Sequence, residues 1–229
     1  MPIFDVTYLI MMAPTIILML WAQHRVKSTF QKYSQVPNQQ RMSGAEVARV
    51  ILDSHGLHDV PVEPVAGELT DHYDPRARAL RLSQPVYNSR SVAALGIAAH
   101  ESGHALQHAQ AYLPLQLRGA LVPVASIGSN FGWIMVLAGM LIGLTQLAWL
   151  GVILFAAGTV FALITLPVEF NASSRALAEL SNMGIVDSTE MGQNKKVLNA
   201  AAWTYIAGFA AAAMQLLYYI MLVSGMRRD

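Results

Sequence analysis

Residues 121–166 read LVPVASIGSNFGWIMVLAGMLIGLTQLAWLGVILFAAGTVFALITL, without a single aspartate, glutamate, lysine, arginine or histidine. A helix that crosses the hydrocarbon core of a bilayer needs roughly 20 predominantly apolar residues. Two such segments fit here, Leu121–Leu144 and Leu147–Leu166, and only Thr145-Gln146 separates them. So short a joint predicts a tight antiparallel hairpin of two transmembrane helices, which returns the chain to the side of the membrane that it left.

Two more segments are apolar enough to span a bilayer, Val6–Gln23 and Ala200–Val223. The chain has 229 residues, of which 54% are hydrophobic and 13% charged, a composition typical of membrane proteins. The net charge of +1 gives no basis for nucleic-acid binding, and the absence of cysteine excludes disulfides and thiolate metal ligands. We therefore expect a mainly α membrane protein with about four transmembrane helices.

Residues 24–120, between the first and second spans, predict a small α/β domain with a short β-hairpin. Ser43–His55 begins with the capping-box pattern Ser-x-x-Glu, which favours a helix start. Val65–Tyr73 and Ala77–Ser83 read as two strands on either side of a turn. A longer helix is expected at about residues 91–111.

Basic residues near the spans indicate the orientation, because they favour the cytoplasmic side. None precedes the first span, and several follow it closely, which places residues 24–120 in the cytoplasm. Basic residues after the third span agree, whereas Arg227 and Arg228 after the fourth disagree. The basic residues that favour this orientation are Arg25, Lys27, Lys32, Arg41, Arg175, Lys195 and Lys196.

The segment His100-Glu101-Ser102-Gly103-His104 matches the pattern H-E-x-x-H. Two histidines one helical turn apart can hold one zinc ion, and the intervening glutamate can act on water as a general base. The alternative is a polar helix face with this spacing by chance. The apolar neighbours on both sides argue against it, since unpaired His and Glu are costly to bury.

A third protein ligand is needed, and two residues compete for the role. His108 lies about 12 Å along a continuous helix from His100, too far for both to bind one ion. Glu169 follows the predicted hairpin directly, so the chain returns it to the face where His104 lies. Pro167 can open a helical segment over 167–199 whose first turn carries Glu169. The alternative for Glu169 is an ordinary charge at a helix start or membrane boundary.

Three motifs together resemble a known family: DHYDP at 71–75, LGIAAHESGHALQH at 95–108 and PVEFNASSRAL at 167–177. They are similar to the YugP-type neutral zinc metallopeptidases of bacterial membranes and, more distantly, to the gluzincin-like HtpX and Ste24 membrane metallopeptidases. The resemblance covers nearly the whole chain. It implies one catalytic zinc ion bound by His100, His104 and Glu169, with Glu101 as the catalytic base.

The chain departs from the wider group at one position, because that group tends to have Asp four residues after the glutamate ligand and this chain has Ser173. Asn171 or another residue is then expected to make the hydrogen bond to the ring nitrogen of a ligand histidine that does not bind the metal. A donor for the tetrahedral intermediate is also needed, and Arg175, His72 and Tyr73 are the candidates.

The expected function is a zinc-dependent endopeptidase of the bacterial cytoplasmic membrane, with its site facing the cytoplasm. Its expected substrates are membrane proteins or peptides at the lipid bilayer; neither a protein partner nor an oligomeric state is indicated. A proteolytically silent zinc-binding scaffold is the main alternative, but it has no chemical need for Glu101. A metal transporter is a third, disfavoured because the later spans carry almost no ionisable residues.

Two local features leave alternatives open. The strand Ala77–Ser83 is either an exposed edge that accepts an extended peptide or part of a hairpin packed on the histidine helix. Asp71, His72 and Asp74 form either a minor metal site or, as the turn sequence favours, a turn-stabilising group.

Overall fold

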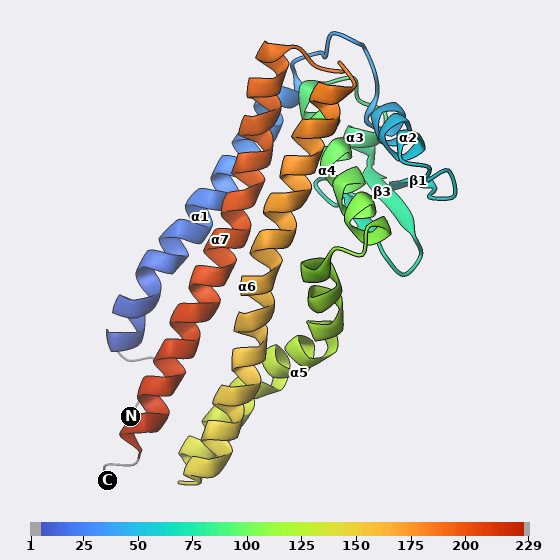
Figure 1. The fold of residues 1–229 in the computed structure, drawn as a ribbon. Helices are drawn as coiled ribbons and strands as arrows, with labels where there is room; N and C mark the ends of the chain where they lie inside the picture. Colours follow the sequence, from blue (N-terminus) through green and yellow to red (C-terminus); the bar gives the residue numbers. More distant parts are fainter. Residues whose placement is uncertain (1–5, 227–229) are drawn as a thin grey trace. The chain divides into compact units, whose positions relative to one another are not determined.

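The computed structural model describes residues 6–226, and the fold is mainly helical (Figure 1). In this part of the chain, four helices are long and apolar enough to cross a membrane. This confirms the expected fold class. The four are α1 (Val6–Ser34), α5 (Leu113–Leu141), α6 (Thr145–Asn182) and α7 (Ser188–Gly225).

The joint between α5 and α6 differs slightly from the prediction. Thr145 begins α6 rather than joining two helices, and the connection is residues 142–144. Gly143 has φ 72°, a left-handed conformation that glycine adopts without strain, and the Leu144 N–H bonds the Gly139 carbonyl at 2.8 Å. The glycine therefore ends α5 three residues earlier than hydrophobicity alone suggests.

The prediction that Pro167 opens a separate helical segment is wrong, because α6 continues through it to Asn182. A proline inside a helix removes one backbone donor, and neighbouring packing can compensate for this loss. After Pro167, the helix buries a stripe of residues at four-residue spacing. Its members are all fully buried: Val168, Ala172, Ala176 and Leu180.

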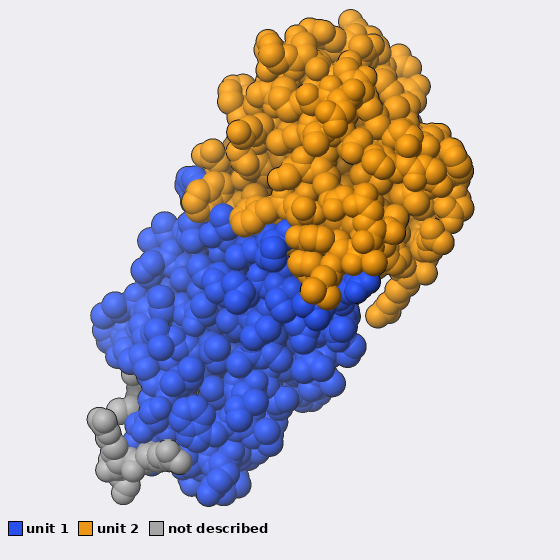
Figure 2. Space-filling model, in the orientation of Figure 1, with its two compact units in different colours: residues 1–23, 116–167, 204–229 blue, residues 24–115, 168–203 orange. Residues whose placement is uncertain are grey.

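The chain divides into two compact units, coloured separately in Figure 2. Among the described residues, unit 1 comprises 6–23, 116–167 and 204–226, and unit 2 comprises 24–115 and 168–203. Unit 1 contains the most apolar parts of the four long helices. Unit 2 contains every residue of the histidine motif together with Glu169.

Within unit 1, small residues let α5 and α6 pack closely as an antiparallel pair. A Cβ at Gly139 would clash with the backbone of Ala148, and one at Gly132 would lie 3.0 Å from the carbonyl of Gly151. Membrane helices commonly associate through such small residues, because lipid offers no hydrophobic drive for their pairing. The contacts support the predicted hairpin.

Unit 2 is a small α/β arrangement in which a three-stranded mixed sheet accompanies three helices that lie wholly within it, together with the ends of the long helices. The strands are β1 (Val62–Val65), β2 (His72–Asp74) and β3 (Ala79–Ser83), in the order β1-β3-β2. β3 pairs parallel with β1 and antiparallel with β2. The helices are α2 (Gly44–Ser54), α3 (Gln84–Tyr87) and α4 (Val92–Ala109).

The sheet corrects two details of the strand prediction. Val65–Tyr73 is not one strand, since β1 ends at Val65 and β2 begins at His72. The strand at 79–83 has partners on both sides, so the hypothesis that it is an exposed edge for an extended peptide is wrong. A parallel pairing such as β1 with β3 has no local sequence signal comparable to a hairpin turn.

The turn between β2 and β3 is held by Asp74, as its sequence suggests. One carboxylate oxygen accepts hydrogen bonds from the Arg76 and Ala77 N–H groups at 2.9 and 3.1 Å, and the other bonds Arg81 at 2.7 Å. These contacts give Asp74 a structural role. They favour the turn-stabilising interpretation over a second metal site.

Helix α4 is the centre of unit 2. Ser91 caps it by accepting a hydrogen bond from the Ala94 N–H at 3.2 Å. Two hydrophobic clusters pack around it, one towards the sheet and α2 and the other towards α6 and α7. This packing makes α4 a rigid base for the polar side chains that it carries.

Candidate metal centre

One glycine brings α4 and α6 close enough to share a site. A Cβ added at Gly103, between the two histidines of the motif, would lie 2.7 Å from the Ala172 carbonyl of α6. Side chains larger than hydrogen would push the helices apart at this point. The glycine inside H-E-x-x-H therefore sets the distance at which Glu169, three residues before Ala172, faces the histidines.

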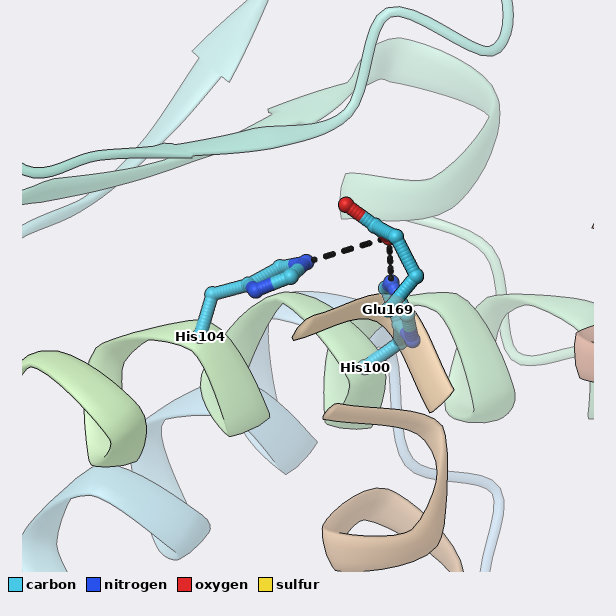
Figure 3. A group of neighbouring side chains, drawn as sticks. All are labelled: His100, His104 and Glu169. Carbon is cyan, nitrogen blue, oxygen red and sulfur yellow. Dashed lines mark hydrogen bonds and ion pairs between the residues drawn. The ribbon is translucent and has the colours of Figure 1, made fainter. Parts of the chain in front are cut away.

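The three predicted ligand residues converge on one point (Figure 3). Oε2 of Glu169 lies 3.3 Å from Nε2 of His100 and 3.5 Å from Nε2 of His104. The two imidazole rings are 4.8 Å apart and nearly perpendicular. Glu169 is only 2% exposed, so its carboxylate needs a positive partner.

The far side of each imidazole is also engaged. Nδ1 of His100 lies 3.1 Å from the Ser173 hydroxyl, and Nδ1 of His104 lies 3.0 Å from Oε1 of the fully buried Gln107. Such contacts fix the ring orientation and tautomer of a histidine that binds metal through its other nitrogen. Ser173 therefore occupies the place expected of Asp, and Gln107 is a partner that the sequence did not predict.

A chain of hydrogen bonds identifies which nitrogen of His104 carries its proton. Arg175 has only donors, and its Nε bonds Oδ1 of Asn171 at 2.7 Å. The Gln107 amide nitrogen donates to that same Oδ1 at 3.0 Å and to the Val168 carbonyl at 2.8 Å. Its oxygen must then face His104, which donates from Nδ1. In neutral His104 this leaves a lone pair on Nε2, pointing towards Glu169.

This arrangement fits a metal ion by the chemistry of its donors. Lone pairs of imidazole nitrogen and carboxylate oxygen face one another at a distance that needs a cation between them. Burial alone lowers the pKa of His104, but the Glu169 hydrogen bond and the charges of Glu101 and Glu169 outweigh it and raise that pKa. A proton or a metal ion relieves the repulsion, and two imidazoles with one carboxylate form a ligand set typical of zinc.

Glu101 is buried on α4 beside this cluster, with 8% of its surface exposed. Its charge also reaches Asp71, whose pKa is raised chiefly by burial and further by Glu101, against the opposing effect of hydrogen bonds from Ser83. Asp71 accepts bonds from the N–H and the hydroxyl of Ser83 at 2.8 and 3.0 Å. Asp71 thus anchors β2 to β3 near Glu101.

The remaining predicted residues have other partners. His108 lies outside the metal-binding group, and its Nδ1 is 2.8 Å from the Tyr73 hydroxyl. Nδ1 of His72 bonds the Thr70 carbonyl, and Arg175 bonds Gln110 as well as Asn171. None of these contacts involves a ligand residue, so the donor for the tetrahedral intermediate stays a prediction.

The comparisons with known proteins agree with the geometry. A family model described as "Putative neutral zinc metallopeptidase" matches residues 8–224. The chain is 51% identical, over 90% of its length and 91% of the relative's, to "Putative membrane protease YugP" of Bacillus subtilis (strain 168). No solved structure matches the chain. The chain belongs to the neutral zinc metallopeptidase family.

Proposed function

We propose that the protein is a membrane-integrated zinc endopeptidase that hydrolyses peptide bonds in membrane-associated proteins or peptides. The observation that carries this proposal is the convergence of His100, His104 and Glu169, with Glu101 beside them on α4. The first three would hold one zinc ion. When bound, zinc polarises a carbonyl group and makes water more acidic.

Glu101 has the proton-transfer role in this proposal. Its carboxylate takes a proton from the attacking water and delivers it to the leaving amine, acting first as base and then as acid. Ser173 and Gln107 hold the two imidazoles in orientation throughout. Because α4 is packed on both sides, these groups keep their positions while the substrate reacts.

The proposed substrate class rests on the chain around Glu169. This residue lies two positions after Pro167, the last residue of unit 1 in α6, and the same helix carries the most apolar window of the chain. A site on such a helix suits peptide segments close to the bilayer. The basic residues that follow the first span favour a site on the cytoplasmic side of the membrane, and the similar protein from Bacillus subtilis supports a bacterial membrane.

The test is metal analysis and peptidase assay of purified wild type, Glu101→Gln and Glu169→Ala. Glu101→Gln should keep zinc and lose activity by about 10²–10⁴-fold, the typical contribution of general acid–base catalysis. Glu169→Ala should lose both zinc and activity. Glu68→Gln is the matched control, because Glu68 is an exposed residue of the segment between β1 and β2.

Two outcomes would contradict the proposal. Full turnover by Glu101→Gln rejects this residue as the base, and a wild type that holds zinc but cleaves no peptide favours the silent scaffold. Substrate preference needs a separate comparison between soluble casein and a membrane-embedded protein. Equal cleavage of the two removes the support for membrane-associated substrates.

A further inference from the structure

Unit 2 has a cavity between the parts of α6 and α7 that belong to it, lined by residues from 170 to 177 of α6 and from 195 to 202 of α7. The cavity measures about 390 Å³. This volume lies within the roughly 300–1,000 Å³ that is typical of small-molecule sites. One of its lining residues is Ser173, whose hydroxyl bonds His100. The cavity therefore touches a residue that orients a metal ligand.

The cavity is lined by one charged side chain, Lys195. Lys195 is exposed, and no carboxylate among residues 6–226 lies within ion-pair distance of it. An ammonium group without a counter-ion at a cavity wall favours an anionic ligand.

The polar groups around Lys195 suit a phosphate. Asn199 lines the same cavity and offers an exposed amide. Lysine commonly binds phosphate as a point charge, and amide N–H groups add directional hydrogen bonds to its oxygens.

The rest of the lining is apolar and points to a ligand with an apolar remainder. Phe170 is 42% exposed, and Leu177 and Ala202 add to the same wall. Along the chain, Phe170 comes three residues after the last unit 1 residue of α6, and Ala202 two residues before unit 1 resumes in α7. Free phosphate can contact only the Lys195 ammonium group and its polar neighbours, whereas a phospholipid can also contact the apolar wall.

We propose that this cavity binds the phosphate headgroup of an anionic phospholipid. Lys195 and Asn199 contact the phosphate, and Phe170 and Leu177 contact the glycerol and the first methylenes. Basic sites beside membrane helices are a recognised means of holding anionic lipid headgroups. The test measures lipid binding directly, so it needs no peptidase activity.

The experiment measures binding of dioctanoyl phosphatidylglycerol to the full chain in detergent, by calorimetry or native mass spectrometry. Lys195→Gln should weaken binding about tenfold, and Phe170→Ser several-fold. The matched control is Lys196→Gln, because Lys196 is also exposed but does not line the cavity. The affinity of this control for phosphatidylglycerol should stay within about twofold of wild type. Dioctanoyl phosphatidylcholine should bind more weakly than phosphatidylglycerol to wild type, because its choline cation repels Lys195.

Three results would overturn the proposal. Equal losses in the two lysine variants mean that only diffuse surface charge attracts the lipid. Inorganic phosphate that displaces the lipid at equal concentration means that the site takes a free anion. Equal binding of phosphatidylglycerol and phosphatidylcholine means that net charge is not recognised. Lys195, Lys196 and Phe170 are all exposed, so none of the three substitutions alters the buried core.

Discussion

Gln107 provides the sharpest test of how the metal centre is held. Gln107→Leu keeps a side chain of similar size but removes three hydrogen bonds, to His104, Val168 and Asn171. The Asn171 oxygen keeps its bond from Arg175, and the Val168 carbonyl keeps its helical partner. The cost therefore falls on His104, whose Nδ1–H is left buried without an acceptor.

An unsatisfied buried donor costs about 1–3 kcal/mol. The loss of an outer partner of a ligand histidine typically weakens metal binding about 10–100-fold, equivalent to about 1.4–2.8 kcal/mol. The two figures agree, so we expect the zinc dissociation constant of Gln107→Leu to rise about 10–100-fold. Because His104 loses its fixed orientation, the visible spectrum of the cobalt-substituted protein should change as well.

The measurement is a chelator competition on purified protein with unchanged circular dichroism. Gln110→Leu is the matched control. It is the same substitution three residues along, and it removes a bond to Arg175 but touches no histidine. Its zinc affinity should stay within about twofold of wild type. If the two variants bind zinc equally well, Gln107 does not position His104 and the reasoning fails.

Three other predictions follow from the packing, the charge and the topology. Gly103→Ala should lower the free energy of unfolding by about 1–3 kcal/mol, because the added Cβ would clash with the α6 backbone. Gly192→Ala is the control: its Cβ would lie in open space on α7, and the substitution should raise the free energy of unfolding slightly. Denaturant titration measures both values. Burial raises the pKa of Asp71, so its contribution to wild-type stability is fully present at low pH and is lost as pH rises through that raised pKa. The stability of Asp71→Asn should not show this loss. If the difference in unfolding free energy between wild type and Asp71→Asn stays constant from pH 4 to 8, the prediction is wrong. The native chain has no cysteine, so Leu69→Cys should react with an impermeant maleimide only from the cytoplasmic side and Ile142→Cys only from the other.

The helices were largely predictable because hydrophobicity is a property of the local sequence. A run such as 147–166 has no other stable environment than lipid or a protein core. The ends were less predictable, since α6 continues past Pro167 and α7 begins at Ser188, where the sequence is amphipathic rather than apolar. In those segments the helix is stabilised by tertiary packing, which leaves only a weak trace in composition.

The three residues of the metal-binding group could be predicted from the sequence for a different reason. The spacing of His100 and His104 is local, and the tight hairpin predicts that Glu169 returns to the same face. The role of Gln107 as the partner of His104 was not predicted, because it depends on a hydrogen bond to α6 for which the local sequence has no pattern. Its one sequence signal is its position three residues after His104, which places it on the same helix face.

The charges around the centre explain why the neutral Ser173 and Gln107 suit their role as partners of the two histidines. A zinc ion bound there would bring two positive charges, and the ionised carboxylates of Glu169 and Glu101 would together bring two negative ones. A further carboxylate behind either histidine would leave excess negative charge in a buried region, where such charge is costly. Burial chiefly raises the pKa of the nearby Asp71, and the charge of Glu101 raises it further. Neutral partners on both imidazoles therefore orient the two histidines, and with zinc bound the net charge of the centre would stay close to zero.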